Sequence, residues 1–97
     1  PIEVQGSRNL YASLRVSDDE SVLVLVNMGD EPITDYSLSL AQGAVAQNLD
    51  PSQIKVTSII GNVDGSAPTL TEGRGFVDYV PVRSIAPYAT VLLALED

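Results

Sequence analysis

Apolar and polar residues alternate along much of this chain, which is the pattern of β-strands that bury one face. The first clear case is the run 10–16, in which one face carries Leu10, Ala12, Leu14 and Val16. Successive side chains of a strand point to opposite faces, so this period of two predicts a half-buried strand. After the polar turn 17–21, the run Val22–Met28 is apolar on both faces for five residues. It predicts a central strand that is covered on both sides and that forms a hairpin with the first strand.

Turn residues divide the rest of the chain into short segments. The turn Gly29–Pro32 precedes a third alternating run at residues 36–40. Residues 41–52 show no sustained period, so we expect a long connection there that crosses from one sheet to the other. Further strands are predicted at residues 54–60, 69–71, 76–80 and 89–95.

The spacing of these segments predicts the fold class. Turn signals recur roughly every 8–12 residues, which is typical of β-sandwiches and not of βαβ units. We therefore expect an all-β fold, an antiparallel β-sandwich of about seven to eight strands with Greek-key-like connections. A helix at residues 40–48 is disfavoured because the segment is short and contains Gly43. We interpret residues 1–8 as a lead-in or linker and residues 9–97 as a single domain.

The chain is strongly acidic, with a net charge of −8 from 5 basic and 13 acidic residues. Its basic residues are scattered, so it lacks the basic patch by which proteins bind nucleic acid or an anionic membrane surface. No apolar run approaches the roughly 20 residues of a membrane-spanning helix. Cysteine is absent, which excludes disulfides and thiolate metal sites. This composition fits a cytoplasmic and a secreted bacterial protein equally well.

The sequence offers no recognisable catalytic chemistry. Histidine is absent, which excludes triads built on that base, and the single lysine, Lys55, belongs to no Ser-x-x-Lys motif. Carboxylates gather at residues 18–20 and 30–31, both in predicted turns, where we expect a solvated loop. Calcium is the alternative ligand of such clusters, but their spacing matches no EF-hand loop. We therefore assign no catalytic residue, no metal site and no cofactor to this chain.

Aromatic side chains are the remaining candidates for binding. Tyr36 is in phase with the apolar positions of its strand and is expected in the core, whereas Tyr11 lies on the face opposite Leu10. Tyr79 and Tyr88 flank the segment between two prolines, where their rings either pack against the loop or a neighbouring domain, or form a platform for a sugar ring. These two tyrosines are the candidate carbohydrate-binding residues.

Four segments of the chain together resemble one known family. They are Leu10–Arg15, the strand Val22–Asn27 with the turn that follows it, Tyr79-Val80-Pro81, and Ile85–Thr90. In this order they resemble the C-terminal β-sandwich domain of α-amylase-family glycoside hydrolases. In that family a first strand ends in Arg, a hydrophobic strand ends in Asn, and the last strands contain an aromatic-x-Pro and a Leu-Ala-Pro motif. The chain departs from this pattern at Ile85, where Leu is usual, and at Ala89.

The resemblance implies that this domain follows a catalytic (β/α)8 barrel in a parent enzyme that hydrolyses α-glucans with retention of configuration. Because the catalytic carboxylates of the family lie in the barrel, no catalytic residue carries over to this chain. The expected role is to cap and stabilise the barrel, to which the apolar residues of Val22–Val26 would bind. If the barrel is missing, that surface is expected to drive self-association. Two alternatives stay open: a carbohydrate-binding module that contacts α-glucan, and an immunoglobulin-like protein-interaction domain.

Overall fold

The computed structural model describes residues 2–17, 20–42, 50, 53–60, 65–70 and 74–96. These residues form seven strands, and none of them belongs to an α-helix. The strands are β1 (Glu3–Gln5), β2 (Leu10–Val16), β3 (Ser21–Asn27), β4 (Ser37–Gln42), β5 (Lys55–Ile60), β6 (Arg74–Tyr79) and β7 (Thr90–Glu96). No helix long and apolar enough to cross a membrane occurs in this part of the chain.

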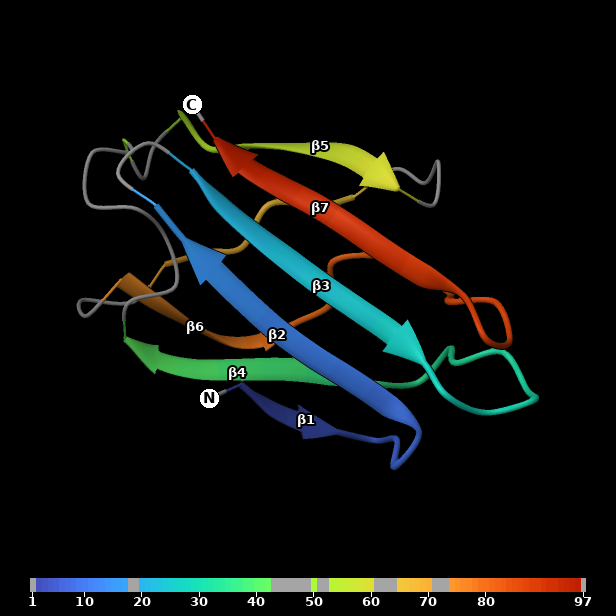
Figure 1. Ribbon diagram of the computed structural model, residues 1–97. Helices are drawn as coiled ribbons and strands as arrows, with labels where there is room; N and C mark the ends of the chain where they lie inside the picture. The colour runs from blue at the N-terminus through green and yellow to red at the C-terminus, as the bar shows by residue number, and fades with distance from the viewer. Residues whose placement is uncertain are drawn as a thin grey trace.

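The strands form two sheets that pack face to face (Figure 1). One sheet has four strands in the order β2-β3-β7-β5, and the other has three in the order β1-β4-β6. Every pair of neighbours is antiparallel, and the chain changes sheet repeatedly between β3 and β7. The expected all-β antiparallel sandwich is therefore confirmed.

The hairpin predicted from the first two alternating runs is also confirmed. Strands β2 and β3 pair without a register shift from Leu10 opposite Asn27 to Val16 opposite Ser21. Strand β3 also pairs with β7, which makes it a central strand. The prediction that both of its faces are covered is met only in part within this chain: Leu23 and Leu25 are fully buried, whereas the three valines on the other face are only partly buried. An apolar pattern shows which side chains could be buried, but not whether a neighbouring layer is present to bury them.

The core lies between the two sheets. Its fully buried aliphatic side chains come from both sheets: Leu23, Leu25, Leu38, Leu93 and Leu95. Tyr36 belongs to this core, as expected, and its hydroxyl donates to the Val82 carbonyl oxygen at 2.6 Å and accepts from the Val82 N–H at 3.2 Å. This pair of hydrogen bonds fixes the segment after β6 against the segment before β4, because a buried hydroxyl left without a partner would be costly.

Several predicted boundaries differ from the structure. The segment 1–8 includes β1, which pairs with β4 through Val4 opposite Leu38; a three-residue strand is too short to show a period of two. Thr69 and Leu70 lie outside any strand, so the strand predicted at 69–71 is wrong for these two residues, and Thr71 lies outside the described residues. Most of the predicted connection 41–52 also lies outside them. The remaining strands match the predictions to within a few residues.

Candidate functional site

The outer face of the four-stranded sheet carries an apolar stripe. Side chains alternate between faces, so the neighbours of buried Leu23 and Leu25 point away from the core. The strand register then defines the apolar stripe as Val22, Val24, Val26, Leu92 and Ala94. Val22 lies opposite Ala94 and Val24 opposite Leu92, so the stripe is continuous across β3 and β7. None of its members belongs to the core cluster, although Ala94 is itself buried.

Exposed apolar side chains flank the apolar stripe on both neighbouring strands. Tyr11 of β2 lies opposite Val26 and is 51% exposed. On β5, the register shifts between Ser58 and Ile60, and Ile60 lies opposite Leu92 with half of its surface exposed. Contiguous apolar surface of this kind marks a protein–protein interface more often than isolated exposed residues do. The apolar stripe with these flanks is therefore the candidate docking face.

Charge is distributed unevenly with respect to this face. By register, the charged residues of the described strands that point to the docking face are Arg15, Lys55 and Glu96. Lys55 and Glu96 lie opposite each other at one end of the sheet, and Arg15 lies on the far strand beside Val22. These three charges sum to +1 whereas the whole chain carries −8, so this face is less acidic than the chain as a whole. It would suit an apolar partner surface that carries carboxylates at its edges.

A buried asparagine ends strand β3, on the face opposite the docking face. Asn27 is 1% exposed, and its Nδ2 donates to the carbonyl oxygens of Glu31 at 2.7 Å, Ile85 at 3.2 Å and Ala86 at 3.1 Å. Its Oδ1 accepts from the Gly29 N–H at 2.9 Å. One side chain thus ties the turn after β3 to the segment before β7. We call this arrangement the Asn27 latch.

The segment held by the Asn27 latch is a tight turn. The Ala89 N–H donates to the Ala86 carbonyl oxygen at 3.1 Å, which places Pro87 and Tyr88 at the two central positions. The φ angle of Tyr88 is 57°, as a type II turn requires at its third residue, where glycine is preferred. The Tyr88 N–H donates to the Gly29 carbonyl oxygen at 3.2 Å, so the two turns touch, as Figure 1 also shows at the ends of β3 and β7.

The two tyrosines predicted as a sugar platform lie in different environments. The Tyr79 ring is 5% exposed, packs 5.0 Å from the Phe76 ring at an interplanar angle of 60°, and donates its hydroxyl to the Ser66 carbonyl oxygen. Burial raises the pKa of Tyr79 well above its usual range. The Tyr88 ring is 69% exposed. A platform needs two exposed ring faces, and of the two predicted tyrosines only Tyr88 has an exposed ring.

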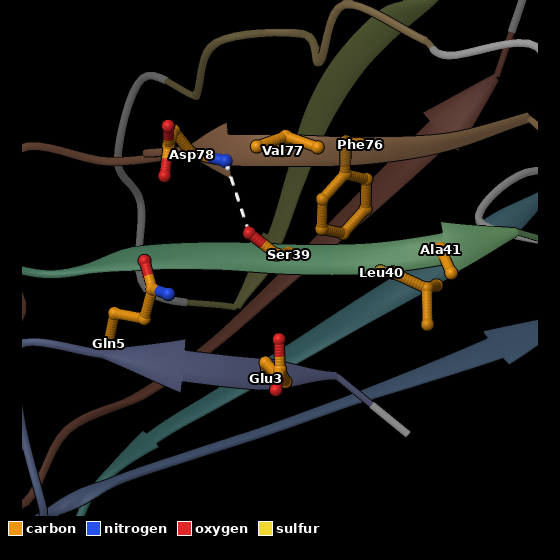
Figure 2. Close-up of a pocket in the computed structure, with 8 residues that line it drawn as sticks. All are labelled: Glu3, Gln5, Ser39, Leu40, Ala41, Phe76, Val77 and Asp78. Atoms are coloured by element: carbon orange, nitrogen blue, oxygen red, sulfur yellow. Dashed lines mark hydrogen bonds between the residues drawn. The ribbon is translucent and has the colours of Figure 1, made fainter.

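The outer face of the three-stranded sheet carries a groove of about 550 Å³ (Figure 2), in which apolar side chains supply most of the surface; we call it the polar groove after its two carboxylates, its amide and its hydroxyl. It is lined by Glu3, Gln5, Ser39, Leu40, Ala41, Phe76, Val77 and Asp78. Glu3 lies opposite Ser39, and the register shift between β4 and β6 sets Val77 and Asp78 on the other side of that serine. Asp78 has a φ of 53° and donates its N–H to the Ser39 Oγ at 3.2 Å. The groove offers oxygen acceptors to hydroxyl or ammonium groups.

Among the described residues, no group of three or more acidic, histidine or cysteine side chains could hold a metal ion. The apolar run at Val22–Val26 was the one sequence signal that identified the docking face. The sequence placed Asn27 at the end of a hydrophobic strand but did not indicate the hydrogen-bond partners of its side chain. The bulge at Asp78 had no signal in the sequence, because Gly is the residue that usually marks such a conformation.

No family model, curated protein or solved structure matches this chain.

Proposed function

We propose that this chain is the non-catalytic C-terminal domain of an α-amylase-like glycoside hydrolase that acts on α-glucans. In this proposal the domain caps and stabilises the catalytic (β/α)8 barrel of the same parent chain. The observation that carries it is the apolar stripe. The stripe lies on the outward face of the sheet, although the chain as a whole is strongly acidic, with a net charge of −8. Three valines and a leucine there keep part of their surface exposed, and a partner surface would cover it.

The Asn27 latch supports the resemblance from which the proposal began. Two of the motif segments, the strand that ends in Asn27 and the segment Ile85–Thr90, are far apart in sequence. The latch joins them through hydrogen bonds from Asn27 to the carbonyl oxygens of Ile85 and Ala86. Motif residues that bond to each other are better evidence for a shared architecture than residues that only match in order.

The apolar stripe is large enough to matter energetically. Full burial of an aliphatic side chain contributes about 1.5–3 kcal/mol. Val22, Val24, Val26 and Leu92 are already largely buried, so covering their remaining surface would contribute roughly 0.5 kcal/mol each, on the order of 2 kcal/mol together. In this proposal the domain is tethered to the barrel by the chain itself. The loss of translational freedom on docking therefore offsets little of the free energy gained by burying the stripe.

The first test is the reading frame that encodes this chain, which should also encode a (β/α)8 barrel on the amino-terminal side. The second is deletion of residues 1–97 from that parent. We expect the melting temperature of the catalytic portion to fall by several degrees because the barrel loses its apolar cover. Glu3→Gln in the polar groove is the matched control and should leave the melting temperature unchanged. A parent without a barrel, or one whose stability and starch hydrolysis survive deletion intact, would refute the proposal.

Carbohydrate binding is the alternative that a direct titration can decide. A ¹⁵N-labelled sample of the chain titrated with maltoheptaose should give no saturable amide shifts if the domain is only a structural cap. Saturable shifts around Tyr88 or around the polar groove would instead favour a carbohydrate-binding module. Light scattering of the same sample reports self-association, which we expect to weaken when Val24→Lys is introduced into the apolar stripe.

A further inference from the structure

Strand β2 is the one outermost strand of the two described sheets that has no feature protecting its edge. The strand orders leave β2 and β5 outermost in one sheet and β1 and β6 outermost in the other (Figure 1). An unpaired edge can bind a further strand, and short strands, bulges and charges prevent this. Strand β1 has three residues, and β5 and β6 each shift register against their neighbour. The seven residues of β2 pair with β3 without a shift, and Arg15 is their only charge.

Two hydrogen bonds that flank β2 show which of its backbone groups face the free edge. The Met28 N–H donates to the Asn9 carbonyl oxygen at 2.8 Å, and the Ser17 N–H donates to the Glu20 carbonyl oxygen at 2.9 Å. The bonds of an antiparallel pair alternate along each strand, so the odd-numbered residues of β2 bond to β3. The backbone N–H and C=O groups that point to the free edge are those of Leu10, Ala12, Leu14 and Val16.

The side chains of β2 are arranged symmetrically about Ser13. Residues at equal distances from Ser13 form the pairs Leu10 with Val16, Tyr11 with Arg15, and Ala12 with Leu14. These residues lie opposite each other when two copies of the strand pair antiparallel across a two-fold axis at Ser13. In that register the even-numbered residues of both copies face each other with their free N–H and C=O groups, as the hydrogen-bonded pairs of an antiparallel ladder require.

The residues brought opposite each other are also chemically complementary. On the core-facing side both pairs are apolar, and Val16, which is 49% exposed, gains cover. On the outer side Tyr11 is 51% exposed and Arg15 is also exposed. Their Cβ atoms would lie about 4.5–5.5 Å apart across the two copies, which lets the guanidinium of Arg15 stack on the Tyr11 ring. Arg15 never faces its own copy, so the interface is self-complementary, as a two-fold dimer requires.

We propose that two copies of this chain pair through the free edge of β2, with Ser13 on the two-fold axis, so that their four-stranded sheets become one continuous sheet. This inference does not depend on the proposed function, because it uses the edge of β2 and not the apolar stripe. An interface one strand long is small, so the dimer forms only as the protein concentration rises. Each copy has a net charge of −8, so added salt, which screens the repulsion between copies, should strengthen the dimer.

Single cysteines test the register, because the chain has none of its own. Opposite residues of a non-hydrogen-bonded pair have Cα atoms about 4.5 Å apart, which a disulfide can bridge. Ser13→Cys lies opposite itself, so we expect air oxidation to give a cross-linked dimer on non-reducing electrophoresis. Tyr11→Cys is the matched control: its two copies lie about 13 Å apart along the strands, so it should cross-link poorly. Adding Arg15→Cys to Tyr11→Cys should restore the cross-link.

Sedimentation velocity then tests the dimer without cysteines. Ala12→Pro removes an N–H of the free edge and no bond to β3, so we expect a folded chain, checked by circular dichroism, that stays monomeric at concentrations where the wild type dimerises. Val24→Lys in the apolar stripe should leave the Ser13→Cys cross-link unchanged.

Three results would overturn the inference. Equal cross-linking of Ser13→Cys and Tyr11→Cys would indicate random collision. A Ser13→Cys cross-link that Val24→Lys abolishes would indicate association through the apolar stripe. A wild-type chain that is monomeric at every concentration, with no Ser13→Cys cross-link, would leave the edge of β2 to a strand of a different protein.

Discussion

Replacing Asn27 with alanine tests whether one buried side chain holds the two turns at the end of the docking face. Asn27 is 1% exposed and makes four side-chain hydrogen bonds. The Nδ2 group has two hydrogens, so its three acceptors share them and the side chain makes the equivalent of about three full bonds. Each net hydrogen bond contributes about 0.5–1.5 kcal/mol, so a simple sum gives about 1.5–4.5 kcal/mol. Two of the acceptors keep a backbone donor after the change, because Ile85 still accepts from Ile33 and Ala86 from Ala89. The main losses are then at Gly29 and Glu31, so the expected cost is about 3 kcal/mol.

Thermal and urea unfolding of the 97-residue chain would measure this cost. For a domain of about this size, 1 kcal/mol shifts the melting temperature by about 4–8 °C, so Asn27→Ala should lower it by about 12–24 °C. The urea midpoint should fall with little change in the m-value, since the same surface is exposed on unfolding. A loss under about 0.5 kcal/mol would refute the reasoning, because it would mean that water replaces every bond of the latch without cost.

Asn27→Asp is the matched variant, because it keeps the shape and the Oδ1 acceptor but loses the Nδ2 donor. At pH 7 it would place a carboxylate against three carbonyl oxygens, so it should be more destabilising than Asn27→Ala. Burial and these oxygens raise the pKa of the new carboxyl above its unfolded value. The loss of folding stability caused by ionising the new carboxyl is therefore absent below its unfolded pKa of about 3.9. This loss grows as the pH rises through the folded pKa. Equal stability of Asn27→Asp at pH 4 and pH 7 would contradict this account.

Three further predictions concern the core and the turns. Leu25→Ala in the central strand should cost about 2–5 kcal/mol by urea unfolding, because the side chain is fully buried; a loss under about 0.5 kcal/mol would show that it packs elsewhere. Burial raises the pKa of Tyr79, so its neutral form stabilises the fold below pH 10 and this contribution is lost as the pH rises above 10. Tyr79→Phe should therefore flatten the fall in melting temperature above pH 10, and an unchanged alkaline profile would argue against it. Gly6→Ala should destabilise by more than about 1 kcal/mol, since φ is 95° and the new Cβ would meet the Asp35 carbonyl oxygen. Gly29→Ala should cost less, because there the new Cβ meets only a side chain; equal losses would contradict the steric argument.

Much of the four-stranded sheet could be predicted from the sequence. The hairpin of β2 and β3 is local, and the alternation of residues 10–16 with the apolar run that follows was enough to identify both strands. The last strand was recognisable from its apolar residues. In contrast, β1 carries three residues, too few for a period to be visible, and the bulge at Asp78 has no glycine to mark it. The burial of Tyr79 could not be predicted either, because its place in the sequence does not reveal that its ring packs beside Phe76.

The sequence by itself determined the fold class, the central strand and the lack of histidine and cysteine chemistry, because these depend on composition and on the alternation of neighbouring residues. The tertiary structure decided which apolar face stays uncovered, which tyrosine is exposed, and that Asn27 bonds to Ala86, 59 residues away. The physical reason is that a period of two shows that a strand has two faces without showing what covers either one. Covering layers and long-range hydrogen bonds depend on segments distant in the chain, and these are fixed only when the two sheets pack together.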